Sequence, residues 1–321
     1  MNELIFSLNT VLPLVLLVVI GFFIKKINLL KDEFYPAAEK FVFRVALPCS
    51  LFLSVSGADP STAFSVRLIL FCVIGTIVAA LVIGALTVIF IKSNAERGAF
   101  IQGGYRSNFA LLGSALADRL FPVSGLAAAS ALMPFTIPLF NVIAVATFSL
   151  FAPAEKKQTP TEILKKTLRG IVTNPLIIGI ALAVPFMLLR ISLPGIVTGT
   201  LKYVGSIASP LALICIGASL GSGFEVAKLR KALFCSLIKT ALLPAAAVAV
   251  AILLGMRDVE LGLVLILFGS PTAVSSYIMA KNMDSDEKLA AQILMISTVL
   301  CAFTLFVGIY ILTSFNLIPM T

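Results

Sequence analysis

The sequence predicts an all-α membrane protein whose ten transmembrane helices form an inverted repeat of five plus five. Composition is the first reason: 60% of the 321 residues are hydrophobic and only 12% are charged, with a mean hydropathy of +1.09. A soluble domain carries about 25% charged residues, so most of this apolar surface must face lipid or other buried helices. The distribution of basic residues and a motif repeated at a constant spacing predict the topology and the repeat.

Ten apolar segments are each about long enough to cross roughly 30 Å of hydrocarbon. Two polar breaks decide the count, because such runs cannot remain in lipid-exposed hydrocarbon. Asp118, Arg119 and Pro122 divide the fourth helix from the fifth, and the polar residues from Asn282 to Glu287 divide the ninth from the tenth. In chain order, the predicted helices are 4–24, 35–55, 66–91, 97–119, 123–151, 171–190, 196–221, 232–255, 258–280 and 288–313.

Basic residues orient these helices. Four of them, Arg67, Arg119, Arg190 and Arg257, fall on one side of the predicted membrane and fifteen on the other. The richer side is cytoplasmic by the positive-inside rule, so we expect a multi-pass protein of the inner (plasma) membrane with both termini outside. Because five is odd, a second five-helix unit must enter the membrane from the opposite face. The fifteen are Lys25, Lys26, Lys31, Lys92, Arg97, Lys156, Lys157, Lys165, Lys166, Arg169, Lys228, Arg230, Lys231, Lys281 and Lys288.

The predicted organisation is a first repeat over 1–154, a cytoplasmic linker over 155–170 and a second, inverted repeat over 171–321. In the linker, Thr159-Pro160-Thr161-Glu162 is typical of a capping box with proline at the first helical position. We expect a short helix within 152–170 that lies on the inner leaflet. A simple connection between the halves is favoured over a regulatory site.

The repeated motif interrupts the fourth and ninth helices. Arg106-Ser107-Asn108-Phe109-Ala110 and Gly269-Ser270-Pro271-Thr272-Ala273 lie 163 residues apart. Asn108 competes for backbone hydrogen bonds, with Gly103 and Gly104 expected to loosen the helix before it, and Pro271 lacks a donor. A lone proline is usually only a kink and a lone asparagine often joins two helices. The shared spacing instead favours two broken helices that mark a transporter's binding site.

These interruptions predict an anion site at mid-membrane. Half-helix ends expose N–H groups with partial positive charge, and Arg106 adds a full charge beside them. A structural ion pair or a carbonyl cap is the alternative role for Arg106. Asn108, Ser270 and Thr272 would donate further hydrogen bonds. No acidic residue lies deep in a span, since Glu39 is near an end, so a cation is disfavoured as the main substrate.

Other residue counts exclude whole classes of chemistry. Histidine is absent, which removes histidine metal sites and Ser-His or Cys-His catalysis. The five cysteines lie in apolar spans without CxxC spacing, so we expect free thiols, no metal site and no cofactor. The net charge of +9 reflects membrane topology and not nucleic-acid binding. We expect no enzyme; a Ser–Lys intramembrane site using Lys239 is the remote alternative.

Four more basic residues lie inside predicted spans. Lys40 and Lys202 are near span ends, where their side chains reach the interface. Lys239, two turns into its helix, could reach the inner interface in the same way. For Arg44, pairing with the region of Glu39 and lining a cytoplasmic vestibule are equally favoured.

Together these features resemble the auxin efflux carrier family over essentially the whole chain. The motifs that carry the resemblance are Val45-Ala46-Leu47-Pro48, Arg106-Ser107-Asn108-Phe109, Leu139-Phe140-Asn141-Val142 and Pro271-Thr272-Ala273, in this order and spacing. The resemblance implies the fold of bile acid sodium symporters, in which helices four and nine cross at their breaks. It also implies a scaffold of helices one, two, six and seven and a moving core of helices 3–5 and 8–10.

By position, the resemblance places Asn108 and Pro271 at the crossing, with Arg106 and Asn141 close to it. The chain departs from the family at Gly113-Ser114-Ala115, where members often have Gly-x-Pro, and it lacks the long hydrophilic loop of plant members.

The sequence therefore predicts a secondary or potential-driven transporter of small organic anions, such as auxin-like carboxylates or dicarboxylates, by elevator-type alternating access. A sodium- or proton-coupled symporter of the same fold is the main alternative, and a non-transporting membrane sensor is another. The expected partners are the substrate anion and the lipid bilayer. The large lipid-facing surface also permits a homodimer.

Overall fold

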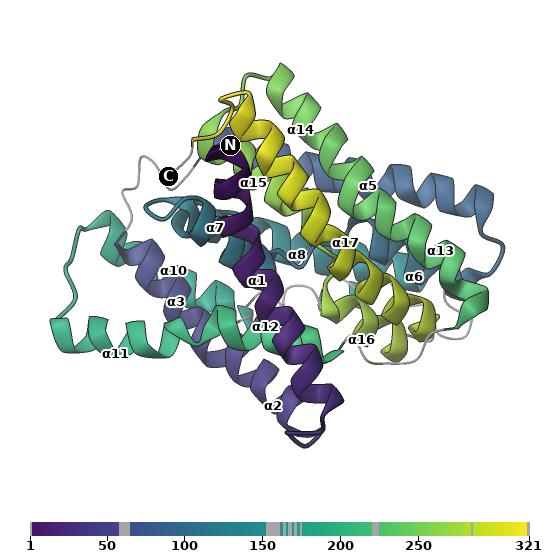
Figure 1. Cartoon of the computed structure of the whole chain (residues 1–321), viewed down its shortest axis with the longest axis horizontal. Helices are drawn as coiled ribbons and strands as arrows, with labels where there is room; N and C mark the ends of the chain where they lie inside the picture. The colour runs from purple at the N-terminus through teal and green to yellow at the C-terminus, as the bar shows by residue number, and fades with distance from the viewer. Residues whose placement is uncertain are drawn as a thin grey trace.

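A computed structural model describes residues 2–57, 65–151, 161–162, 165, 169, 172–173, 175–219, 225–283 and 285–319. These residues form helices and connecting turns, and no strand occurs among them. Figure 1 shows long helices that cross one another around a centre where several short ones meet. The predicted linker helix within 152–170 falls almost wholly outside the described residues.

The first half of the chain follows the predicted ranges closely. Its second helical segment, predicted as 35–55, contains a π-helical turn, and its fourth is interrupted. The elements are α1 (Asn2–Lys26), α2 (Phe34–Phe41), the π-helical turn η1 (Val42–Ala46), α3 (Leu47–Ser56), α5 (Val66–Phe90), α6 (Asn94–Tyr105), the π-helical turn η2 (Phe109–Gly113), α7 (Ser114–Leu120) and α8 (Gly125–Phe151).

The second half departs from the prediction at two places. The helix predicted at 196–221 is divided at Ile207, and the one predicted at 232–255 begins earlier, at Val226. The elements are α10 (Pro175–Leu188), α11 (Gly195–Ser206), α12 (Ala208–Ser219), α13 (Val226–Leu237), the π-helical turn η4 (Ile238–Leu242), α14 (Leu243–Leu253), α15 (Asp258–Gly269), α16 (Val274–Asn282) and α17 (Glu287–Ser314).

Six helical stretches in the described part of the chain are long and apolar enough to cross a membrane by length and composition. They are 66–90, 125–151, 195–218, 226–253, 258–277 and 287–314. α7 ends at Leu120 before a turn that contains Pro122, and a polar connection separates α16 from α17, which confirms the two divisions on which the predicted helix count depended. The described residues are therefore all-helical, and their long apolar stretches are those expected of a multi-pass membrane protein.

Two helix pairs bring the halves of the chain together. α1 packs along α12, and α10 packs along α3. At the first contact the backbones touch: a Cβ added to Gly21 would lie 2.0 Å from the carbonyl oxygen of Ile214, and one added to Gly217 would lie 1.9 Å from that of Val18. Glycine is required at both positions because any side chain would force these helices apart.

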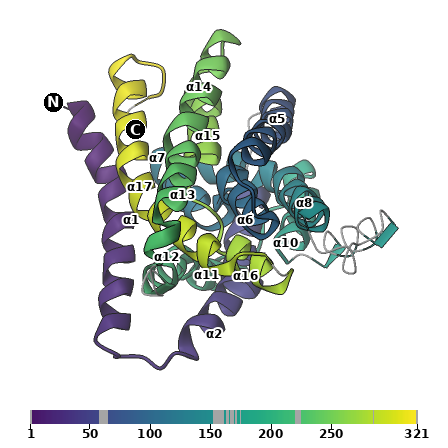
Figure 2. The ribbon, with the colours of Figure 1, turned by 90° about the vertical axis from the view of Figure 1, so that its right-hand side faces the viewer.

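The interrupted helices lie at the centre of the molecule. α6 packs against α5, α8 and α17, and α15 packs against α14 and α17. In Figure 2, α1 and α17 run upright and side by side at the left, and α6 and α16 lie to their right. Phe109, Leu116, Leu263 and Ile266 are all at most 1% exposed, so this centre is a packed core.

Candidate functional site

The first interruption lies where the sequence predicted it. α6 ends at Tyr105, Arg106 is extended (φ −73°, ψ 130°), and the chain becomes helical again only at Phe109. Gly103 and Gly104 do not loosen α6 as expected, because both lie within its regular part. An added Cβ would lie 2.7 Å from Ile293 at Gly103 and 3.0 Å from Ile83 at Gly104, so these glycines permit close packing.

The second interruption also matches its prediction. α15 ends at Gly269, and Ser270 (φ −60°, ψ 145°) and Ala273 (φ −69°, ψ 141°) are extended. Pro271 has no N–H to donate to the preceding turn. The helix resumes at Val274.

The two interruptions contact each other directly. The backbone N–H of Asn108 donates to the carbonyl of Pro271 at 2.8 Å. The hydroxyl of Thr272 donates to the carbonyl of Gly103 at 2.6 Å, so a residue of the second break caps the end of α6. The repeated motif therefore joins two segments that are far apart in sequence.

Arg106 is buried beside this contact, with 6% of its surface exposed. Its guanidinium donates to Oδ1 of Asn141 on α8 at 2.7 Å and to Sδ of Met279 on α16 at 2.9 Å. The structure thus brings Arg106 and Asn141 together. No carboxylate among the described residues pairs with Arg106, so its charge is balanced only by neutral acceptors.

Four polar side chains around the two breaks are buried without a protein partner. They are Ser107, Asn108 (through its Nδ2), Ser270 and Ser276, and each is at most 5% exposed. A buried polar group without a partner costs about 1–3 kcal/mol, and each such group calls for an explanation. A bound ligand with several acceptor oxygens would satisfy these donors.

Sequence reasoning missed Ser107 and Ser276 as site residues. Ser107 could have been found, because it lies 163 residues before Ser270, the same spacing that joins Asn108 to Pro271. Ser276 carries no such signal.

Lys239 lies elsewhere than expected. It is 0% exposed in η4, and its ammonium donates to the carbonyl of Phe268 at 2.6 Å, near the end of α15. The expectation that this side chain could reach the inner interface is therefore wrong. The acceptor of the ammonium is a backbone carbonyl at the end of an interrupted helix, and the sequence alone does not show that Lys239 lies beside it.

The other basic residues inside predicted spans are exposed. Lys40, Arg44 and Lys202 all lie on the surface, as expected for Lys40 and Lys202. Arg44 lies in η1 and forms no ion pair with Glu39 among the described contacts.

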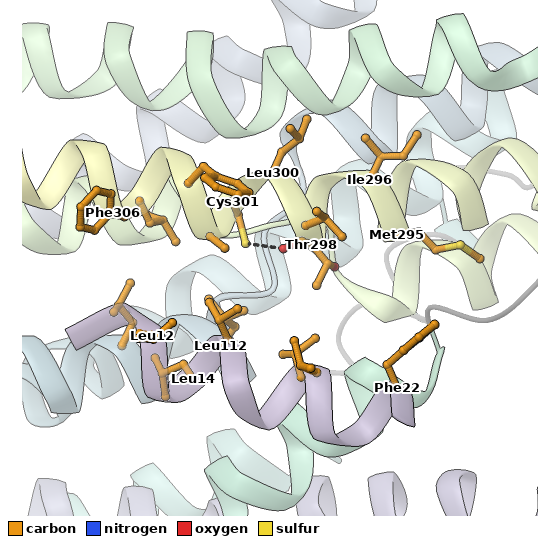
Figure 3. A pocket seen from close by; sticks show the side chains of 18 residues that line it. Leu12, Leu14, Phe22, Leu112, Met295, Ile296, Thr298, Leu300, Cys301 and Phe306 are labelled. Carbon is orange, nitrogen blue, oxygen red and sulfur yellow. Dashed lines mark hydrogen bonds between the residues drawn. The ribbon is translucent and has the colours of Figure 1, made fainter. Parts of the chain in front are cut away.

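A cavity of about 820 Å³ lies between α1 and α17, and its inner wall is formed by Leu112 and Leu116. Figure 3 shows Leu12, Leu14 and Phe22 of α1 facing Met295, Thr298 and Phe306 of α17 across it. None of the predicted site residues lines this cavity. Its apolar walls suit a hydrocarbon chain and offer no group that would bind a charge.

Charged groups at the helix ends form a separate set, which we call the rim. Lys231 donates to both carboxylate oxygens of Glu96 at 2.8 Å, Lys228 lies 2.7 Å from Asp286, and Lys288 lies 2.5 Å from Glu225. The hydrogen bond from Lys288, followed by that from Lys228, holds the pKa of Glu225 below its usual range. Each of these three lysines thus has a carboxylate partner.

Metal chemistry has no support in the described part of the chain, where no group of three or more Cys, Asp or Glu residues could hold a metal ion. The cysteines are free thiols, as predicted.

Comparison with known proteins gives two matches. A model of the family described as membrane transport protein matches residues 6–309. An uncharacterized transporter of Methanocaldococcus jannaschii is 25% identical over 299 residues, which cover 91% of this chain and 94% of the relative. Both matches extend over nearly the whole chain.

Proposed function

Because the chain belongs to the membrane transport protein family, the family of the auxin efflux carriers, we propose that it carries small organic anions across the membrane. The substrate binds where the interruptions at Arg106–Asn108 and Ser270–Ala273 meet. A carboxylate of the substrate pairs with Arg106, and the buried donors around it complete the site.

The observation that carries this proposal is the group of unpartnered donors beside an unpaired cation. Ser107, Asn108, Ser270 and Ser276 are buried without partners, and Arg106 has no carboxylate in the described residues. Carboxylate oxygens accept several hydrogen bonds at once and bind a guanidinium with both oxygens. An anion would therefore satisfy all of these groups together.

The helix ends favour the same sign of charge. Neither η2, which begins after Asn108, nor α16, which begins after Ala273, has a hydrogen bond from a capping side chain. Free N–H groups at helix N-termini attract anions. No described Asp or Glu is buried, so the protein supplies no carboxylate that would compete with the substrate for these donors.

Elevator-type movement is the mechanism we propose for this site. The pairs α1–α12 and α10–α3 correspond to the scaffold helices one, two, six and seven, and the interrupted helices belong to the moving core. The 163-residue spacing supports an inverted relation of the two halves. An inside-negative potential of 100 mV contributes about 2.3 kcal/mol to the export of a monoanion, which is enough to drive uniport without a coupling ion.

Uptake of labelled carboxylates into proteoliposomes tests the proposal. Replacing Arg106 by alanine removes a charge-assisted contact of about 1.5–3 kcal/mol, so substrate affinity is expected to fall about 10- to 100-fold. Arg106→Lys keeps the charge without the planar fork and is expected to lose less. Asn108→Ala is expected to weaken binding as well, through loss of Nδ2.

Arg230→Ala is the matched control, because Arg230 is an exposed cation of α13 without a described partner. It is expected to transport like the wild type. Unchanged substrate affinity in both Arg106→Ala and Asn108→Ala would disprove the site.

A further inference from the structure

Lys239 is a second buried cation, and the proposed anion site does not use it. It lies in η4, has no exposed surface, and donates to the carbonyl of Phe268 at 2.6 Å. The ionisable groups beside it are the thiols of Cys235 and Cys301, and neither is a carboxylate. The backbone at the end of α15 therefore provides its described acceptor.

The carbonyl of Phe268 is available because of the break that follows it. In a continuous helix this carbonyl would accept from the N–H of Thr272, but that N–H donates to the hydroxyl of Ser297 at 3.2 Å. The preceding carbonyl loses its donor as well, since Pro271 has no N–H. The last carbonyls of a helix carry partial negative charge, so the end of α15 attracts a cation.

The carbonyl end of the other interrupted helix is occupied too. Gly103, near the end of α6, accepts from the hydroxyl of Thr272 at 2.6 Å. Both carbonyl ends thus hold donors of the protein itself, whereas neither amide end has a side-chain cap. In transporters with interrupted helices, such carbonyl ends commonly coordinate the coupling Na⁺.

We infer that the ammonium of Lys239 is a resident cation, held at the carbonyl end of α15 where an ion-coupled transporter would bind Na⁺. This inference rests on the proposed function and sharpens it: anion transport by this protein does not require Na⁺. The hydrogen bond from Lys239 occupies the end of α15 without a bound sodium ion, so the neighbouring break keeps its shape whether or not sodium is present.

Sodium replacement in the wild type is the first test. Uptake of a labelled carboxylate into proteoliposomes is expected to change less than twofold when choline replaces all external Na⁺ at constant membrane potential. An increase of tenfold or more with Na⁺ would overturn the inference, whatever the behaviour of any variant.

Removal of the resident cation is the second test. Lys239→Ala vacates the carbonyl end of α15, and uptake in choline is expected to fall at least tenfold. Addition of 100 mM Na⁺ or methylammonium is expected to restore at least a third of it, since both are small enough to reach the vacated carbonyl. Lys202→Ala, which removes an exposed lysine of α11, is expected to transport like the wild type in every medium.

A purely structural lysine would not produce rescue that depends on the size of the cation. Wild-type uptake by Lys239→Ala in choline would overturn the inference, and so would a folded Lys239→Ala whose lost uptake no small cation restores. If Lys239→Ala does not fold, Lys239→Ser, which also vacates the carbonyl end of α15 but leaves a hydroxyl in the space, replaces it in the same measurements with the same expected rescue.

Thermal unfolding in detergent separates this inference from the proposed function. Lys239→Ala is expected to unfold at a higher temperature in Na⁺ than in choline, while the wild type is expected to show no difference. Absence of carboxylate transport together with this sodium effect would reject the proposed function and keep the resident cation. Carboxylate transport by the wild type, together with no effect of sodium on the unfolding of Lys239→Ala, would keep the proposed function and reject the resident cation.

Discussion

The cations of the rim and the cations of the interior are treated in opposite ways by the same chain. Lys228, Lys231 and Lys288 are partly or largely exposed, and each lies within hydrogen-bond distance of a carboxylate. Arg106 and Lys239 are buried, and neither has a carboxylate partner among the described residues. Among the described residues, the partly exposed lysines of the rim, whose charge water already screens, have carboxylate partners. The two buried cations, whose charge is not screened by water, have none.

This difference is costly, because a buried charge without an opposite charge is strongly disfavoured. The structure offsets the cost of Lys239 with a helix carbonyl end and that of Arg106 with the amide oxygen of Asn141 and the sulfur of Met279. A carboxylate of the protein beside Arg106 would be the cheaper solution for stability alone. The absence of such a carboxylate among the described residues agrees with the proposal that the site receives its anion from outside.

Asn141→Asp should give Arg106 a carboxylate partner like those of the rim lysines. This substitution has the largest expected effect. The new carboxylate would lie 2.7 Å from the guanidinium, so it would pair with Arg106 and displace the substrate anion. Substrate affinity is expected to fall about 10- to 100-fold, while the unfolding temperature rises by at least about 2 °C. Proteoliposome uptake and thermal unfolding in detergent measure the two changes.

Asn141→Ser is the control for this change, because it shortens the acceptor without adding a charge. It should lower the unfolding temperature and weaken transport less than Asn141→Asp does. Wild-type affinity in Asn141→Asp would show that Arg106 does not contact the substrate.

Removal of the hydroxyl groups near Arg106 should have an intermediate effect. In Ser107→Ala and Ser270→Ala the lost hydroxyl has no protein partner, so stability without substrate is expected not to fall and to rise by up to about 1–3 kcal/mol. Each lost hydrogen bond to the substrate is worth about 0.5–1.5 kcal/mol, which raises KM about 2- to 10-fold.

Ser130→Ala is the matched control for the serines. Its buried hydroxyl donates to the carbonyl of Leu126 at 2.5 Å and lies on α8, eleven residues before Asn141. This variant should keep the wild-type KM. If Ser107→Ala and Ser270→Ala also keep it, the unpartnered hydroxyls do not bind substrate.

At the rim, Lys231→Met should have a small effect confined to stability. The pair with Glu96 is partly exposed, and such pairs are worth about 0.2–1 kcal/mol. Unfolding in detergent is expected to show this loss at low salt and a smaller one at 0.5 M NaCl, because salt screens exposed charges. Transport that falls as far as in Arg106→Ala would contradict the separation of rim and interior.

The smallest expected effect is a pH dependence at Glu225. Because Lys288 and Lys228 lower the pKa of this carboxylate in the folded state, its contribution to stability is complete above the ordinary glutamate pKa of about 4.3. The contribution is lost as pH falls through the lowered value. The unfolding temperatures of the wild type and Glu225→Gln should therefore differ by a constant amount from pH 7 to 5 and converge in stronger acid; a difference that grows in acid would reverse the sign of this argument.

Local chemistry explains which features the sequence could predict. Asn108 and Pro271 disrupt helices by their own side chains, so both breaks and the division between α7 and α8 could be located from residues alone. The contact between Asn108 and Pro271 was implied only by the family resemblance, since helix breaks carry no information about their partners.

Features that depend on tertiary contacts were missed. The early start of α13 has no single residue that dictates it, whereas η1, η4 and the division at Ile207 each precede a proline (Pro48, Pro244 and Pro210) that is visible in the sequence. In the sequence, Lys239 looks like any lysine in an apolar helix whose side chain reaches the interface. Its buried ammonium is instead held by the carbonyl of Phe268, 29 residues away. The pairing of Arg106 with Met279 likewise needs the fold to bring α16 beside α6.

The glycine contact between α1 and α12 has a mechanical consequence. At Gly21 and Gly217 the two backbones touch with no side chain between them, so displacement of either helix along the other would press carbonyl oxygens into main-chain atoms. This seam resists shear, whereas an apolar cavity of about 820 Å³ lies between α1 and α17. On its two sides α1 therefore meets one neighbour with its backbone in contact and another across an apolar cavity.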